Sequence, residues 1–121
     1  MLSTDIPEEE KPHIDAIARA VLLGFEHIPL PHMAALFYRR RLDSAIETIS
    51  ICAADEAIAA RWNAHEYVRR GDRAADPVWQ SQGTVADVIE ELLELAPPGT
   101  PGAPTLGLRS SSSLVLPGCG L

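Results

Sequence analysis

The side chains that could carry out nucleophilic chemistry in this sequence are Cys52 and His65. Cys52 stands where a predicted strand meets a predicted helix start, a position at which amide dipoles can activate a thiol, and the imidazole of His65 could act as its base. No surrounding motif supports the pair, and a buried cysteine usually behaves as a small hydrophobic residue. A small enzyme that uses Cys52 and His65 is therefore one alternative, and the sequence favours a protein that is not an enzyme.

The histidines lack the tight spacing of a zinc site, which needs three or four ligands that are often paired on a turn or helix. They are His13, His27, His32 and His65. The sequence also has no glycine-rich phosphate loop, no Gly-x-Ser-x-Gly elbow and no His-Glu-x-x-His motif. We expect no bound metal and no cofactor, with surface or capping roles for the histidines.

Arg39, Arg40 and Arg41 follow Phe37 and Tyr38, and arginine beside aromatic residues can hold phosphates and stack bases. The same residues are also typical of the end of a β-hairpin, which is the favoured interpretation. The net charge of −7 argues against nucleic-acid binding by charge alone, although nearly all the arginine lies in the middle of the chain. The candidate interaction residues are Arg39, Arg40, Arg41, Trp79, Leu114, Val115 and Leu116.

The clearest helix of the sequence begins at Thr84 and ends before Pro97. Thr84 is a good N-cap because its hydroxyl can accept a free amide hydrogen, and Asp87 stands where a capping-box carboxylate reaches back. Pro97 cannot continue a helix. Apolar residues repeat at the spacing of one helical face, at Val85, Val88, Ile89, Leu92, Leu93 and Ala96. We expect this face to anchor the core.

The sequence signals for the other helices and strands are weaker. An amphipathic helix is predicted from Pro12 to Glu26, with apolar residues at Ile14, Ile17, Ala18, Val21, Leu22 and Phe25. We predict strands at Met33–Arg41 and Ala45–Cys52, an alanine-rich helix from Ala54 to His65, and strands at Tyr67–Arg70 and Pro77–Gln82. One long helix from Asp43 to His65 is the alternative, because this stretch also matches a helical stripe.

These elements predict an α+β fold in the order α-β-β-α-β-β-α, with a small antiparallel sheet and amphipathic helices on one face. A mostly α protein is the alternative. We expect a flexible acidic start at residues 1–11, one globular domain at residues 12–96, and an extended tail rich in Pro, Gly and Ser at residues 97–121. The apolar triplet Leu114-Val115-Leu116 could lie in a groove of its own domain, or add to a sheet edge of a partner.

The composition is that of one small acidic domain: 121 residues, of which 46% are hydrophobic. No apolar run approaches the ~18–20 residues that span a membrane, and the acidic start is not a signal peptide. Cys52 and Cys119 lie far apart in the sequence. We therefore expect no structural disulfide and a reducing cytoplasmic location.

The stretches from Gly83-Thr84-Val85 through Pro98-Gly99-Thr100-Pro101-Gly102-Ala103-Pro104-Thr105-Leu106, and from Ser112 to Gly118, resemble a group of small actinobacterial proteins. The alanine- and arginine-rich middle is similar to what high-GC genomes encode. The resemblance covers about the last third of the chain and implies no activity. It implies that the tail is an intrinsic feature of the protein.

The leading hypothesis is a non-enzymatic protein–protein interaction or regulatory module, with self-association through helix faces as its simplest form. The partner is then an unknown protein or a second copy, with neither nucleic acid nor membrane expected. The second hypothesis is a ribosomal peptide precursor, in which a folded leader presents Arg109 to Leu121 for modification at its serines and Cys119.

Overall fold

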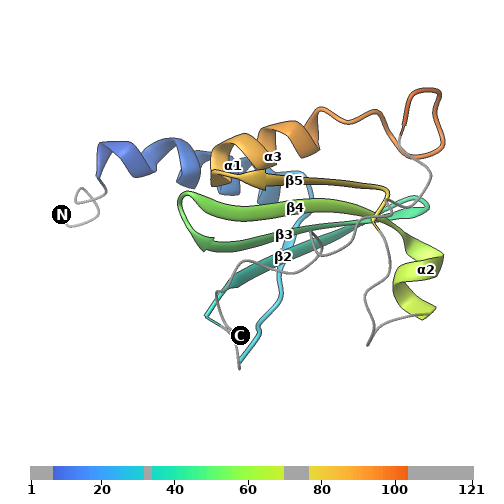
Figure 1. The fold of residues 1–121 in the computed structure, drawn as a ribbon, viewed down its shortest axis with the longest axis horizontal. Helices are drawn as coiled ribbons and strands as arrows, with labels where there is room; N and C mark the ends of the chain where they lie inside the picture. The colour runs from blue at the N-terminus through green and yellow to red at the C-terminus, as the bar shows by residue number, and fades with distance from the viewer. Residues whose placement is uncertain (1–6, 32–33, 70–76, 104–121) are drawn as a thin grey trace.

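The structure is a computed structural model that describes residues 7–31, 34–69 and 77–103. The elements are a 3-10 turn at Glu8–Glu10, α1 at Lys11–Leu22, β1 at Glu26–His27, β2 at Leu36–Leu42, β3 at Ala45–Ala53, β4 at Glu56–Asn63, α2 at Ala64–Arg69, β5 at Trp79–Gly83 and α3 at Val85–Leu93. Within the described residues the strands form one antiparallel sheet in the order β1-β2-β3-β4-β5, with α1 and α3 along one side (Figure 1). The predicted α+β class is confirmed.

Two short turns set the pairing of the central strands. Asp43 and Ser44 connect Leu42 to its partner Ala45, and a second short turn connects Ala53 to Glu56. Asp43 has a φ of 53°, which aspartate tolerates better than most residues because its short side chain can hydrogen-bond locally. Turns of this length join antiparallel neighbours, so β2, β3 and β4 follow one another across the sheet.

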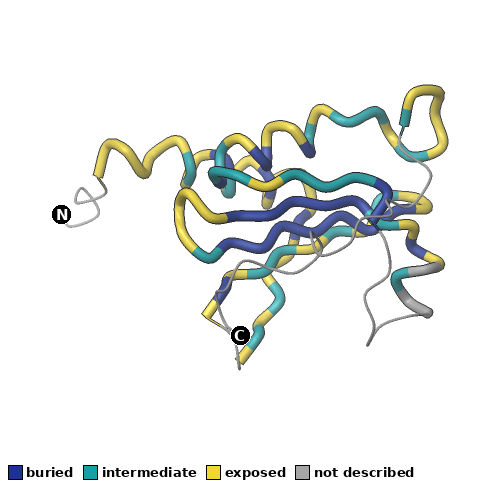
Figure 2. The backbone as a smooth tube through the Cα atoms, viewed as in Figure 1, coloured by how far each residue is buried: buried dark blue, intermediate teal, exposed yellow. Residues whose placement is uncertain are grey.

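Side-chain alternation along the strands gives the sheet two faces. We call the side that packs against α1 and α3 the helix face, and the opposite side the second face. On the helix face lies a core cluster of Ala16, Ala20, Phe25, Ile49, Ile51, Ala57, Ala59, Val85, Val88, Ile89 and Leu92. On the second face a hollow is lined by Phe37, Thr48, Ser50, Ile58, Ala60, Trp62, Tyr67 and Gln80. Figure 2 shows that β3 and β4 are buried over most of their length.

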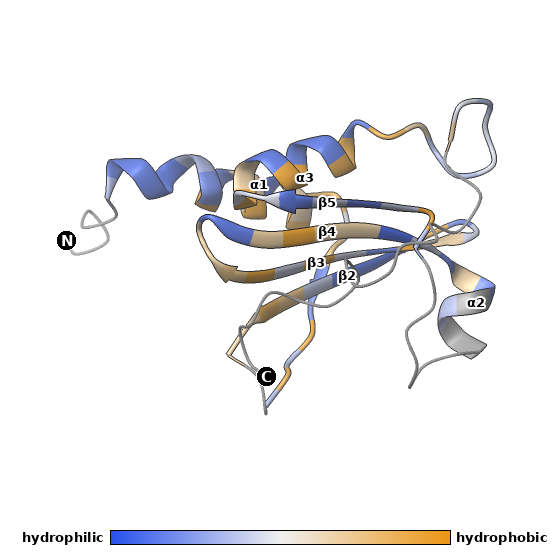
Figure 3. Cartoon of the chain, viewed as in Figure 1, coloured by the Kyte–Doolittle hydropathy of each residue, from blue (hydrophilic) through white to orange (hydrophobic). Residues whose placement is uncertain are grey.

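The core is built from large residues of α3 set against small residues of β4 and α1. Ala57 and Ala59 are buried on the helix face, which lets Val88, Ile89 and Leu92 approach the sheet closely. The apolar residues of α3 lie toward the sheet and its acidic residues away from it, as Figure 3 shows. Of the six residues predicted for this face, Val85, Val88, Ile89 and Leu92 are buried, and Leu93 and Ala96 are partly buried.

Helix α1 ends earlier than predicted, at Leu22 rather than at Glu26. Gly24 has a φ of +109°, and its N–H donates to the carbonyl of Val21 while the Phe25 N–H donates to that of Ala20. This pair of bonds is the Schellman termination, which needs a left-handed residue that glycine supplies at little cost. Phe25 follows it into the core and is 2% exposed.

The predicted helix from Ala54 to His65 is wrong, and so is the alternative of one helix from Asp43 to His65. These residues hold the β3–β4 hairpin and the start of α2. Alanine favours helices, but β4 pairs with β3 on one side and β5 on the other. Alanines are used there because α3 must lie close above them, so tertiary packing overrides propensity.

The strand predicted at Tyr67–Arg70 is also wrong, because the chain forms α2 from Ala64 to Arg69. The signal for a helix start was Asn63, whose side-chain oxygen accepts from the His65 N–H at 3.0 Å. The chain therefore forms a strand, β4, where a helix was predicted, and a helix, α2, where a strand was predicted. The order of the larger elements differs for this reason from the predicted α-β-β-α-β-β-α. The strand predicted at Pro77–Gln82 does form, as β5.

The cap of α3 is testable. The Thr84 hydroxyl accepts from the Asp87 N–H at 3.2 Å, so Thr84→Ala should lower the free energy of unfolding by about 1 kcal/mol. Thr84→Ser keeps the hydroxyl and should stay close to wild type. Urea unfolding followed by circular dichroism measures both. Equal stability of the alanine and serine variants would contradict the assigned cap.

Candidate functional site

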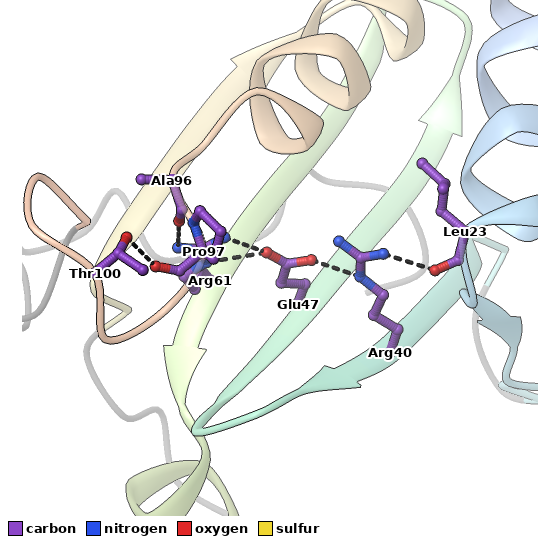
Figure 4. Close-up of polar contacts among 7 residues, drawn as sticks. All are labelled: Leu23, Arg40, Glu47, Arg61, Ala96, Pro97 and Thr100. Atoms are coloured by element: carbon purple, nitrogen blue, oxygen red, sulfur yellow. Dashed lines mark hydrogen bonds and ion pairs between the residues drawn. The ribbon is translucent and has the colours of Figure 1, made fainter.

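The most strongly charged group among the described residues lies inside the protein, on the helix face. The strand register places Glu47 of β3 opposite Arg40 of β2 and Arg61 of β4. Arg40 Nε donates to Glu47 Oε1 at 2.8 Å. Arg61 donates to Glu47 Oε2 from Nε at 2.9 Å and from Nη2 at 2.7 Å. We call these three residues the ion triad (Figure 4).

The ion triad also bonds the end of α1 and the segment that follows α3. Arg40 Nη1 donates to the carbonyl of Leu23, at the end of α1, at 2.6 Å. Arg61 Nη1 donates to the carbonyl of Ala96, beyond α3, at 2.6 Å. The contact with Leu23 is favourable because the last carbonyls of a helix carry the negative end of the helix dipole, whereas Ala96 lies beyond the C-cap of α3, Glu94. Figure 4 shows the resulting chain of contacts from α1 across the sheet to the segment after α3.

The geometry of the ion triad suits a structural role rather than a catalytic one. The Glu47 side chain is 0% exposed and the Arg61 side chain 2%, and both carboxylate oxygens are bonded to guanidinium groups. No buried side-chain nitrogen or oxygen of the described residues is left without a partner. A substrate therefore has no route to the carboxylate.

The second face carries the hollow, which we call the groove, with a volume of about 200 Å³. Trp62 closes one end: its Nε1 donates to the Thr48 hydroxyl at 3.0 Å, and its ring meets that of Tyr67 from α2 at 5.6 Å between centroids. The groove is mostly apolar, with Ser50 and Gln80 as additional polar residues along it. Its volume is below the ~300–1,000 Å³ typical of small-molecule sites, so it suits one or two apolar side chains better.

The three consecutive arginines do not form one patch. Arg40 points into the ion triad on the helix face, whereas alternation puts Arg39 and Arg41 on the second face, where both are exposed. Arg41 Nε donates to the Asp43 carbonyl at 2.9 Å, in the adjoining turn. Trp79 packs partly buried against the core cluster. Leu114, Val115 and Leu116 lie outside the described residues.

The pairing of Cys52 with His65 as nucleophile and base is wrong. Cys52 stands at the turn end of the β3–β4 hairpin, whereas His65 follows Asn63 at the opposite end. At ~3.3 Å per residue the two are about 20 Å apart along the hairpin. Cys52 is moreover disulfide-bonded rather than a free thiol, which also overturns the expectation of reduced cysteines.

Two of the histidines have structural positions. His13 of α1 accepts through Nδ1 from the Ala86 N–H at 3.1 Å, so it caps the first turn of α3 from the neighbouring helix. The ring of His27 packs against that of Tyr38 in a tilted arrangement, with the ring centroids 5.4 Å apart. Within the described ranges no three side chains among His, Cys, Asp and Glu gather as a metal site.

Helix α1 presents an apolar surface that the sequence pattern assigned to the core. Ala16 and Ala20 are the buried residues of α1. Ile14, Val21, Leu22 and Leu23 are 41%, 47%, 84% and 50% exposed, and we call these four the α1 patch. Of the predicted apolar stripe, Phe25 is buried and Ile17 packs against the core cluster. Ile14, Val21 and Leu22 are exposed instead, because alanines, which let α1 approach α3 closely, take the inner positions.

The comparisons with protein-family models, curated proteins and solved structures found no match. No helix in the described part of the chain is long and apolar enough to cross a membrane. The geometry of the described residues is therefore the basis for a functional proposal.

The ion triad predicts a large effect of a small change. Glu47→Gln leaves the buried guanidinium group of Arg61 and the partly buried one of Arg40 without a counter-charge, so the free energy of unfolding should fall by about 3–5 kcal/mol. The matched control is Glu56→Gln, at an exposed position of β4, which should change stability by less than about 0.5 kcal/mol. Urea unfolding measures both, and a loss below about 1 kcal/mol for Glu47→Gln would show that the ion triad is dispensable.

Proposed function

We propose that the protein is a non-enzymatic interaction module that associates with a second copy of itself through the α1 patch. The observation that carries the proposal is the exposure of four large apolar side chains on and just beyond one helix. Exposed apolar patches on small proteins usually mark interaction surfaces. Ile14 and Val21 lie two turns apart on one side of α1, with Leu22 beside them.

A two-fold arrangement is favoured by the charges beside the patch. Asp15 and Arg19 are exposed and lie one turn apart along α1. Two antiparallel copies of α1 bring the acid of each copy toward the base of the other, and a two-fold interface requires such self-complementarity. Burying the exposed parts of the eight patch side chains in a dimer contributes on the order of 10 kcal/mol. This gain exceeds the lower estimates of the free-energy cost of association, which are about 4 kcal/mol.

The alternatives have less support. The enzyme hypothesis required Cys52 and His65 to meet, and the hairpin separates them. Nucleic-acid binding would depend on Arg39 and Arg41 alone, because Arg40 points to the other face of the sheet. Two arginines on a chain of net charge −7 give little attraction for phosphates. The peptide-precursor hypothesis concerns residues 109–121, which lie outside the described residues, and nothing in the described ranges favours it.

The proposal predicts that one charge in the α1 patch breaks the association. Leu22 is 84% exposed, so Leu22→Lys should leave the fold intact and shift a dimer toward the monomer. Glu90→Gln makes the same change in net charge on an exposed position of α3 and should leave the dimer unchanged. Size-exclusion chromatography with light scattering, over a range of protein concentrations, measures the mass. A wild-type monomer at every concentration would sink the proposal.

A further inference from the structure

The groove on the second face contains a polar group that the fold does not use. Ser50 of β3 lines the groove and is 6% exposed. Its hydroxyl has no hydrogen-bond partner among the described residues. Every fully enclosed side-chain nitrogen or oxygen of those residues is bonded, so the Ser50 hydroxyl opens onto the groove. A nearly buried polar group of this kind needs a partner from outside the fold.

The floor of the groove is made of small residues, and aromatic residues stand on either side of it. Thr48 of β3 pairs with Ala60 of β4 on the floor, and both are buried. Phe37 of β2 lies one row of side chains away from this pair, and Trp62 of β4 lies one row away in the opposite direction. The space between them can take one further ring, in the offset or edge-to-face arrangements that aromatic groups prefer.

The Trp62 wall is held in place by the protein itself. Its Nε1 donates to the Thr48 hydroxyl at 3.0 Å. Its ring also packs against that of Tyr67 from α2, with an angle of 59° between the two ring planes. These two contacts fix the orientation of the indole. A wall that is ordered in this way lowers the entropic cost of binding a ligand against it.

The groove favours a neutral ligand. None of its described lining residues carries a charge. On the same face Arg39 stands opposite Thr48, but its other cross-strand partner is the acid Glu26, which offsets its charge. An ion moved into this lining would lose its hydration without gaining a counter-charge. A single neutral polar group, in contrast, can be hydrogen-bonded by Ser50.

The volume of the groove limits the ligand to about one ring. The groove has a volume of about 200 Å³, and an apolar cavity of about 150 Å³ is large enough to bind benzene. A benzene ring with one or two small substituents therefore fits, and such a ring is about as large as one aromatic side chain. A nucleotide or a fused-ring cofactor is too large.

We propose that the groove binds a neutral single-ring phenol, with the ring between Phe37 and Trp62 and the phenol hydroxyl bonded to Ser50. The Ser50 hydroxyl suits this role because it can donate to the phenol oxygen or accept from the phenol O–H. This site lies on a different surface from the α1 patch and does not depend on the proposed self-association.

The first test compares p-cresol with toluene, which lacks only the hydroxyl. In the full-length protein labelled with ¹⁵N, p-cresol should shift the amide signals of Ser50 and Ala60 and the indole N–H signal of Trp62 until they saturate. The indole signal of Trp79, which packs against the helix-face core, should stay in place. We expect p-cresol to bind roughly two- to tenfold more tightly than toluene, because toluene leaves the Ser50 hydroxyl unpaired.

Two outcomes of this titration would overturn the site. One is the absence of saturable shifts at the groove up to the solubility limit of p-cresol, and the other is a set of shifts confined to the α1 patch. Equal affinities for p-cresol and toluene would overturn the assigned hydrogen bond.

The second test changes the groove. Ser50→Ala should make p-cresol and toluene bind equally, whereas Ser44→Ala makes the same change in the exposed β2–β3 turn and should keep the preference for p-cresol. Ala60→Ile fills the floor and should weaken binding of both ligands by roughly tenfold or more. Circular dichroism checks that each variant folds. A preference for p-cresol that survives Ser50→Ala, or unchanged binding by folded Ala60→Ile, would overturn the proposal.

Discussion

A carboxylate that is 0% exposed, held between two guanidinium groups, is the constraint on which this structure depends. Charge can be buried only where it is paired and hydrogen-bonded. Glu47 meets that condition because β2 and β4 each place an arginine directly opposite it. A register slip of one residue would turn either arginine to the second face, so the ion triad accepts only one alignment of the three central strands.

The same guanidinium groups extend this constraint beyond the sheet. Arg40 fixes the end of α1 through the Leu23 carbonyl, and Arg61 fixes the segment after α3 through the Ala96 carbonyl. The sheet, the end of α1 and the segment after α3 thus share one polar network within an apolar layer. The helix face is thus occupied by groups that stabilise the fold. The α1 patch and the groove are the surfaces that could contact a partner.

The parts of the fold that the sequence predicted are those with local signals. The Thr84 cap and the apolar spacing after it identified α3, and β-branched residues identified β3. The alanine-rich β4 was predicted as a helix because its strand form depends on neighbours on both sides and on α3 above it. For α1, the pattern pointed to the large apolar residues, whereas packing required alanines on the inner side.

The candidate sites were harder to predict, because they arise from register rather than from motif. Glu47 and Arg61 are separated in sequence and become neighbours only once the β3–β4 turn is placed. The available signal was an opposite charge in each of two otherwise apolar stretches. The groove is lined by Phe37, Trp62 and Tyr67, which come from three different elements. Because Trp62 lies in the stretch that was predicted as a helix, the sequence did not place it on the sheet beside the other two.

The most direct test of this account is a double-mutant cycle on Glu47→Leu and Arg61→Leu, with unfolding free energies measured by urea for the wild type, both single variants and the double variant. Each single variant buries an uncompensated charge, whereas the double variant removes both charges of that pair. If Glu47 and Arg61 depend on each other, the coupling free energy should be about 1–3 kcal/mol, and the double variant should be more stable than the sum of the single losses implies. Additive losses would contradict it, because they would mean that Glu47 and Arg61 do not depend on each other.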